Sequence, residues 1–436
     1  MPSNQYRPLT KPYPKGSAHK DQVATLNRGL TIFAAVYLVV AFLSTLTQPS
    51  TSRISSPHLP SFSTSPHGSS SSRCNPFLQP GFVAPLPSGL STYHTFDPSC
   101  AAPLLLPTLL SHLPSSPYAK SSIPPKQAID PTLLASGLSN KTVVLIGDRV
   151  DQALVEHFCS LAGHVVDRVD ARHPWAERLA PGSFSEESPL AHYCYVPEYD
   201  FFLTSVYHYG ADQSFFFRGK PAWSATSTFE ERVEKVIVPY LETTTKSFPA
   251  SPTLPPPRTT AAARAPALVV LSSSFWDLAK FAQQDIDNLH SLVQDLDEER
   301  LLQWRSRHVD MLASLHRTFP RSQLAWRSLH APASSERATV EWWTGTQKDT
   351  DAAKNHPLFH LNRIVQLNSA LKSALYPHGD DVVRGSNRAN RIPAGVRDLD
   401  WGNIMLGQDH RMADPVTPAL NPGGSIFAEM LLGQLV

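Results

Sequence analysis

Polar side chains follow several short apolar runs of the chain, and they include the residue types that acyl transfer uses. The residues that follow these runs are Gly147-Asp148-Arg149, His208-Tyr209-Gly210, Ser272 to Asp277 and His330. A Ser, a His and a carboxylate within hydrogen-bond reach of one another supply a nucleophile, a general base and a group that orients the base. If the apolar runs are parallel strands, these side chains lie at the carboxyl edge of one sheet, where ligands bind.

Strand and helix patterns alternate along residues 139–436. The apolar runs predict strands at 142–146, 165–166, 201–206, 267–271 and 323–329. Apolar residues at helical spacing predict helices at 150–162, 228–241, 285–317, 361–375 and 425–435. Gly163 is a helix stop, and Ser227 with Glu230 predicts a capping box. This alternation predicts an α/β fold, in which helices cover both faces of a parallel sheet.

Four segments, in chain order, resemble the PC-esterase-type branch of the SGNH (GDSL-like) hydrolases. They read VVLIGDRVDQALVEHFC, FFLTSVYHYG, LVVLSSSFWDL and DWGNIMLGQ followed by DPVTP, and the similarity spans roughly Cys74 to the C-terminus. The branch includes single-anchor proteins of the secretory pathway that add or remove acyl groups on glycans. The resemblance therefore implies an SGNH-like parallel sheet flanked by helices, and a glycan as ligand.

The two residues that would carry the chemistry differ from the family pattern. In the family the first strand ends in Gly-Asp-Ser, whose Ser is the nucleophile, and a C-terminal Asp-x-x-His completes the triad. Here Arg149 stands at the nucleophile position and Thr417 at the base position, whereas Asp414 matches. A guanidinium stays charged and cannot attack a carbonyl, and Thr cannot shuttle a proton near neutrality. The resemblance thus implies a site that has lost its acyl-transfer chemistry.

The resemblance also assigns roles to other residues of the cleft. Gly210 matches the Gly that helps to form the oxyanion hole, and Ser272 begins the Ser-Ser-Ser that stands where the family often has Asn-Ser-Gly. Asp148, Trp276 and Asp277 are the further cleft residues. No cofactor and no metal are expected.

Arg149 should find a counter-charge if it replaces a hydroxyl in this cleft, because a buried unpaired charge costs several kcal/mol, of order 3–5. We expect it to pair with Asp148, Asp277 or Asp414, and most of all with Asp414, which has lost the His that it would orient. Two alternatives are that Arg149 binds an anionic sugar or phosphate in an open cleft, or that it projects into solvent.

An active site rebuilt from other residues is the competing hypothesis. Ser273 or Ser274 would be the nucleophile, and His410, His330 or His208 the base. The chain contains no Gly-Asp-Ser and no Gly-x-Ser-x-Gly sequence. The function classes are therefore a non-catalytic glycan-binding or regulatory relative, an active glycan O-acyl esterase or O-acetyltransferase, and a structural membrane protein without a ligand site.

Two segments of low complexity interrupt the α/β pattern. Residues 47–138 are rich in Ser and Pro with few charges, which predicts a stem, and from about Cys74 this stem becomes more apolar and predicts an extended arm that packs on the domain. Residues 243–266 predict a disordered insertion within the SGNH-like domain at 139–436.

Residues 29–46 form an uncharged apolar stretch just long enough to cross a bilayer as a helix. A buried core helix and a cleaved signal peptide are the alternatives. The tail at 1–28 carries one acidic residue, Asp21, and five basic ones, Arg7, Lys11, Lys15, Lys20 and Arg28. The positive-inside rule then predicts a type II protein with a cytoplasmic tail. The remainder would lie in the lumen of the secretory pathway (Golgi or ER) or at the cell surface.

All four cysteines follow the predicted anchor, in what would be an oxidising compartment. None forms a CxxC motif, the spacing typical of zinc ligands, which argues against a zinc site. We favour the two short loops, Cys74–Cys100 and Cys159–Cys194, although Cys159 could instead be a buried apolar residue of a helix. Asn140 begins a glycosylation sequon.

The composition narrows the class of partner. The chain has 436 residues, with 38 Lys and Arg against 37 Asp and Glu, so no overall charge favours nucleic acid. The 40 Pro residues and only 17% charged residues indicate that much of the length is linker, whereas 9% aromatic residues exclude a wholly disordered chain. The membrane and a glycan are the expected partners, and nucleic acid is not.

Overall fold

The computed structural model describes residues 74–120, 129–176, 179, 189–211, 228–247 (side chains to 244), 265–272, 274–333, 359–376 and 392–436. The predicted tail, anchor and first part of the stem lie outside these ranges, as do Ser227, Ser273 and most of the predicted insertion. Within the described ranges, no helix is both long enough and apolar enough to cross a membrane.

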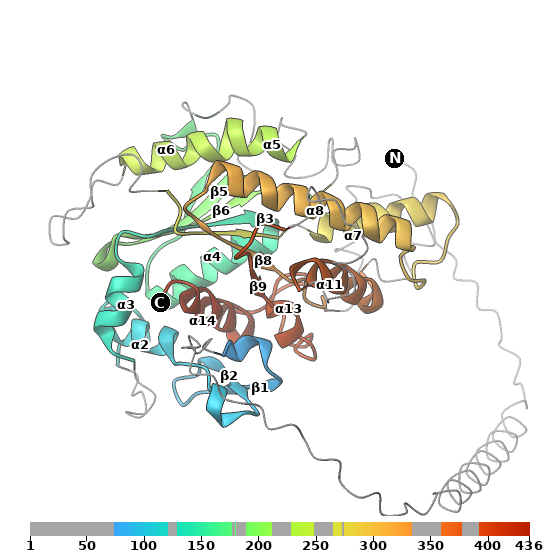
Figure 1. Cartoon of the computed structure of the whole chain (residues 1–436). Coiled ribbons are helices and arrows are strands. Elements are labelled where there is room, and N and C mark those ends of the chain that lie inside the picture. The colour runs from blue at the N-terminus through green and yellow to red at the C-terminus, as the bar shows by residue number, and fades with distance from the viewer. Residues whose placement is uncertain are drawn as a thin grey trace, which may run out of the picture. The chain divides into compact units, whose positions relative to one another are not determined.

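A seven-stranded sheet forms the centre of the compact unit Arg73–Val436 (Figure 1). Its order is β4-β5-β6-β3-β7-β8-β9. The strands are β3 (Thr142–Gly147), β4 (Asp167–Val169), β5 (Ala191–Val196), β6 (Phe201–Tyr207), β7 (Leu268–Leu271), β8 (Gln323–Arg327) and β9 (Arg397–Leu399). The five strands from β6 to β9 in this order are parallel, whereas β5 runs antiparallel to β6, and β4 to β5. The α/β class is thus confirmed, with an antiparallel edge that the sequence did not predict.

Helices cover both faces of this sheet. In the view of Figure 1, α5 (Phe229–Arg232), α6 (Val238–Ser247) and α8 (Glu298–Thr318) lie above it, and α4 (Arg149–Ala162) and α14 (Ser425–Gly433) lie below it. The remaining main helices are α7 (Ser274–Asp287), α11 (Leu361–Leu375) and α13 (Trp401–Ile404). The π-helical segments η6 (Val233–Ile237) and η9 (Leu420–Gly424) lead into α6 and α14. α6 continues into the predicted insertion as far as Ser247, and residues 248–264 lie outside the described ranges.

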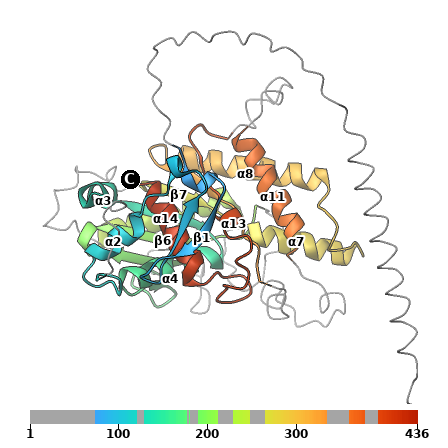
Figure 2. The ribbon, with the colours of Figure 1, turned by 90° about the horizontal axis from the view of Figure 1, so that it is seen from below.

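The segment from Cys74 packs against α14, but as regular structure rather than as an extended arm. It contains the antiparallel hairpin of β1 (Gly81–Pro85) and β2 (Ser91–Thr95), followed by α2 (Leu105–His112) and α3 (Pro131–Leu138). Figure 2 shows the hairpin beside α14. The apolar run that forms α2 is buried on almost every residue, so this part of the predicted stem belongs to the core.

A buried carboxylate fixes α2 to the last helix. Glu429 of α14 accepts hydrogen bonds from the backbone N–H groups of Leu105 at 2.6 Å and Leu106 at 2.7 Å. These two groups are among the first-turn donors that have no partner within a helix. Burial raises the pKa of Glu429 to about 8, and the two N–H donors oppose this shift. The contact joins the two ends of the described chain.

Both favoured disulfides are present, Cys74–Cys100 and Cys159–Cys194, with Cα atoms 5.8 Å and 5.4 Å apart. The second bond links α4 to β5, and both of its cysteines are buried. The prediction of the pairing is therefore confirmed.

The helix predicted at 285–317 is the main error in the element assignment. The structure has two helices there, α7 and α8, separated by the loop 288–297. Leu289 in this loop has a positive φ of 57°, which a helix cannot contain, and Asp297 caps α8 by accepting from the N–H of Arg300 at 2.8 Å. At the start of α5 the N-cap is Thr228, whose hydroxyl accepts from the N–H of Glu231.

Candidate functional site

The carboxyl ends of β3, β6 and β7 lie together, as predicted for a parallel sheet. Gly147 at the end of β3 pairs in register with Tyr207 of β6, and the preceding Ile146 pairs with Leu271 of β7. A Cβ atom at Gly147 would overlap the carboxylate of Asp151 and the carbonyl oxygen of Ser272. Only glycine therefore lets the chain pass from β3 into α4 so close to the end of β7.

Arg149 forms the expected ion pair with Asp414. Arg149 Nη2 lies 3.1 Å from Asp414 Oδ2, and the side chains remain 49% and 32% exposed. The other carboxylate oxygen accepts from the backbone N–H groups of Val416 at 2.9 Å and Thr417 at 2.8 Å. Asp414 is thus held by its own turn while it pairs with the first residue of α4. The ion pair joins the first and last segments of the resemblance.

The position predicted for the general base contains no titrating group. Thr417 is buried, and its hydroxyl has no hydrogen-bond partner among the residues that the structure describes. The neighbouring His330 directs Nε2 to the carbonyl oxygen of Val416 at 2.7 Å, and its pKa falls to about 3, mainly because of burial. A carbonyl oxygen can only accept, so Nε2 carries the proton. His330 therefore holds the Asp414 turn and is not a base for this site.

A second arginine–aspartate pair lies in the core between α4 and the end of β8, and the sequence did not predict it. Arg327 of β8 donates from Nε and Nη2 to the two oxygens of Asp151 at 3.1 Å and 2.9 Å, and both side chains are fully buried. The guanidinium also lies 5.1 Å from the ring centroid of Trp401. A two-point contact of this kind is among the strongest that an arginine makes. It fixes α4 to β8.

Asp148 is the N-cap of α4 and shares this buried environment. Its Oδ1 accepts from the N–H of Val150 at 2.9 Å, and its own N–H donates to Asp151 Oδ2 at 3.2 Å, which completes a capping box. Burial first, and then the charge of Asp151, raise the pKa of Asp148 to about 7, while Arg327 opposes the shift. Asp148 therefore acts as a helix cap within the core.

Trp276 and Asp277 lie in the first turn of α7 and fasten neighbouring elements. The Trp276 indole donates to the hydroxyl of Tyr207 at 3.1 Å. Asp277 accepts from the N–H of Ala211 at 2.8 Å and from the indole of Trp304 at 2.9 Å. Burial raises the pKa of Asp277 to about 7. Both residues are buried, and their contacts tie the end of β6 and α8 to the start of α7.

The two residues at predicted oxyanion-like positions are both near the ends of strands. Gly210 follows β6 with a positive φ of 51°, a conformation that favours glycine. Ser272 follows β7 directly, and its buried hydroxyl has no partner in the described part of the chain.

His208, one of the predicted alternative bases, is buried against Phe229, and burial together with the charge of Arg232 lowers its pKa well below 6.5. A neutral, enclosed imidazole of this kind is a core residue.

Ser274, one of the two predicted alternative nucleophiles, contacts a histidine, but not one of the histidines predicted as its base. Ser274 Oγ lies 3.4 Å from Nε2 of His308 on α8, and Nδ1 of His308 lies 3.1 Å from the carbonyl oxygen of Trp304. Ser274 is 1% exposed and His308 0% exposed. Burial lowers the pKa of His308 to about 4. His410, another predicted base, is exposed, and its Nε2 accepts from Nε of the adjacent Arg411 at 3.3 Å.

A cavity of about 620 Å³ lies between α7 and α8. Asp277 and Trp304 contribute to its wall, whereas Arg149 and Asp414 do not line it. No group of three or more His, Cys, Asp or Glu side chains suited to a metal ion occurs within the described ranges. Comparison of the chain with protein-family models and with curated proteins finds no match.

Proposed function

We propose that this chain is a single-pass type II membrane protein of the secretory pathway whose SGNH-like domain binds a glycan, or regulates glycan acylation, without catalysing acyl transfer. The observation that carries the proposal is the ion pair between Arg149 and Asp414 at 3.1 Å. In the resemblance these are the positions of the nucleophile and of the acid that orients the base.

The chemistry of this pair supports a non-catalytic role. A guanidinium has no lone pair to attack an acyl carbon, and it remains protonated at any pH that the protein survives. Asp414 pairs with Arg149 and accepts from two backbone N–H groups. It therefore does not orient an imidazole, as the acid of a catalytic triad would. Thr417 adds a hydroxyl without a base. The sheet that would carry an acyl-transfer site is retained, and the reacting groups are replaced.

The two disulfides support the proposed compartment. Such bonds persist in the lumen of the secretory pathway and outside the cell, whereas cytosolic thiols are kept reduced. The membrane anchor in the proposal comes from the uncharged stretch at 29–46 and the basic residues that precede it.

Labelling with a serine-directed fluorophosphonate tests the proposal. The purified full-length chain in detergent is incubated with the probe and, separately, with an acyl-ester reporter. We expect no covalent label and no hydrolysis above the buffer rate. Labelling of any serine of the native chain would overturn the non-catalytic function.

The second candidate is an acyl esterase that uses Ser274 and His308. The specific observation in its favour is the hydrogen bond from Ser274 Oγ to His308 Nε2, with the carbonyl of Trp304 in place of the usual carboxylate. Its weakness is that both side chains are enclosed, so an acyl group has no route to Oγ without movement of α7 or α8. Label that appears on the native chain and disappears in Ser274→Ala would establish this candidate.

A further inference from the structure

The cavity between α7 and α8 has the size and lining of a small-molecule site. Its volume of about 620 Å³ lies within the range of ligand pockets. The rings of Phe281 and Trp304, 8% and 4% exposed, form part of its wall. Side-chain amides come from Gln284 and Gln303, and Gln303 Nε2 also donates to Glu299 Oε1 at 3.0 Å. The inner wall is formed by Ala211 and Asp277, next to the end of β6.

The two arginines at this cavity are paired with carboxylates of the protein itself. Arg300 pairs with Asp285 at 2.7 Å and with Asp297 at 3.1 Å. Arg307 donates to both oxygens of Glu230, at 2.7 Å and 2.9 Å, and to the carbonyl oxygen of Ala211 at 3.1 Å. A ligand with a net charge would compete with these pairs, whereas a neutral polar ligand would not.

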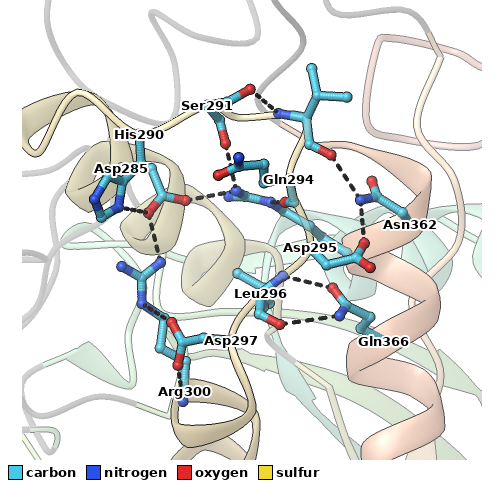
Figure 3. Close-up of polar contacts among 12 residues, drawn as sticks. Asp285, His290, Ser291, Gln294, Asp295, Leu296, Asp297, Arg300, Asn362 and Gln366 are labelled. Atoms are coloured by element: carbon cyan, nitrogen blue, oxygen red, sulfur yellow. Dashed lines mark hydrogen bonds and ion pairs between the residues drawn. The ribbon is translucent and has the colours of Figure 1, made fainter.

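A network of polar contacts links α7, the loop 288–297, α8 and α11 beside the cavity (Figure 3). Asp285, near the end of α7, accepts from Arg300 of α8 and, at 2.7 Å, from Arg363 of α11. Arg363 also donates to the carbonyl oxygens of Ser291 and Gln294 in the loop 288–297. The buried carboxylate of Asp285 therefore connects α7 to both α8 and α11.

Two side chains of α11 extend this network along the same loop. Asn362 donates to Asp295 at 2.7 Å and to the carbonyl oxygen of Val293 at 3.0 Å. Gln366 accepts from the N–H of Leu296 and donates to its carbonyl oxygen (Figure 3). The separation of α7 from α8 is thus fixed before any ligand arrives, and a preformed cavity loses less entropy on binding.

We infer that the cavity between α7 and α8 binds a neutral carbohydrate, with the accessible parts of Phe281 and Trp304 against sugar C–H groups and the amides of Gln284 and Gln303 pairing with hydroxyls. Aromatic rings provide apolar contact area, and each amide offers both donors and an acceptor, which matches a hydroxyl group. The inference rests on the proposed function, and it places the ligand away from Arg149 and Asp414, which do not line this cavity.

Binding of the full-length chain in detergent to an array of immobilised oligosaccharides tests the inference. The array carries neutral oligosaccharides of two to four hexose or pentose units, together with acidic oligouronides. The variants are Gln284→Leu and Gln303→Leu, which each remove an amide, and Gln284→Trp, which fills the cavity. Gln283→Leu is the matched control, because Gln283 is the adjacent residue of α7 and does not line the cavity.

We expect the native chain and Gln283→Leu to bind neutral oligosaccharides equally. Gln284→Leu and Gln303→Leu should each weaken binding about tenfold, the effect of one lost hydrogen bond, and Gln284→Trp should abolish it. Unchanged melting temperatures establish that the variants are folded. Neutral binding that all the variants retain would overturn the inference and leave the proposed function standing, and so would binding of oligouronides alone. No binding of any oligosaccharide would count against the inference and against glycan binding as the function.

Discussion

Two arginine–aspartate pairs lie near the start of α4, and they differ in their access to water. Arg149–Asp414 is half-exposed, whereas Arg327–Asp151 is fully enclosed. Exposed ion pairs contribute little to stability because water screens them, but removal of one member of a buried pair leaves an uncompensated charge. Replacement of the exposed pair should therefore cost little stability, whereas the buried pair supports the sheet.

Arg149→Ala should lower the free energy of unfolding by about 1 kcal/mol or less. Arg327→Leu should lower it by about 3–5 kcal/mol, because the carboxylate of Asp151 stays in the core without its partner. Urea denaturation of the two full-length variants beside the native chain measures both values. Equal losses in the two variants would contradict the assignment of one pair to the surface and the other to the core.

The pH dependence of stability should report the carboxyl group of Asp148. Its pKa is 3.8 in an unfolded chain and about 7 in the folded protein, so between these values the folded state holds the proton more tightly. The stability that this group contributes is full below about pH 4 and is lost as the pH rises through about 7. Asp148→Asn keeps the oxygen that accepts from Val150 and has no proton to lose.

The melting temperature of Asp148→Asn should therefore match that of the native chain near pH 4 and exceed it by several degrees above about pH 7. Asp310→Asn, at an exposed position of α8, is the control. A difference that is constant with pH, or that has the opposite sign, would show that burial does not raise this pKa.

The sequence predicted the residues of the exposed pair because each stands in a short segment with a recognisable position. It did not predict Asp151–Arg327 or Ser274–His308, because these contacts depend on which strands and helices become neighbours in three dimensions. Only Asp151 had a local signal, its spacing of three from Asp148, which is that of a capping box.

At the scale of elements, the prediction succeeded where a pattern was long and failed where a short feature interrupted it. Leu361–Leu375 was predicted with its observed bounds. The sequence pattern does not reveal the break between α7 and α8, because helical spacing continues on both sides of the loop that ends at the cap Asp297. The strands β5 and β9 were missed as well. β9 has only three residues, and β5 lies at an antiparallel edge.

The bond between Cys159 and Cys194 connects α4 to β5 and closes a loop of 35 residues. Loop-closure entropy predicts that its removal by Cys159→Ser with Cys194→Ser lowers the free energy of unfolding by about 4 kcal/mol. Chemical denaturation of the double variant checks this value. Unchanged stability would mean that β4 and β5 are held to the sheet by their other contacts alone.

At the scale of the whole molecule, the compact unit begins earlier than the alternation of strands and helices indicated. The hairpin β1–β2 and the helix α2 pack beside α14, and Glu429 joins α2 to that helix. Composition favoured a stem because Ser and Pro are frequent throughout 47–138, yet the apolar run that forms α2 buries enough surface to fold. Contacts between the two ends of a chain have no local signature.

The proposed topology predicts that a reporter fused to the C-terminus is protected from protease in intact vesicles. The reason is the excess of basic residues before the stretch at 29–46. Asn140, if it is used, should carry a glycan that an endoglycosidase removes, and Asn140→Gln is the control. Digestion of the C-terminal reporter without detergent would contradict the orientation.

The most direct test of the central claim is fluorophosphonate labelling of two proteins side by side, the native chain and the double variant Arg149→Ser with Thr417→His. The variant places a hydroxyl at position 149, where the guanidinium now pairs with Asp414. It places an imidazole at position 417, where the backbone N–H now donates to Asp414. We predict no label on the native chain and label on the introduced serine of the folded variant. A labelled native chain, or a folded variant that neither labels nor hydrolyses an ester, would contradict the claim that Arg149 occupies the position of a former acyl-transfer nucleophile.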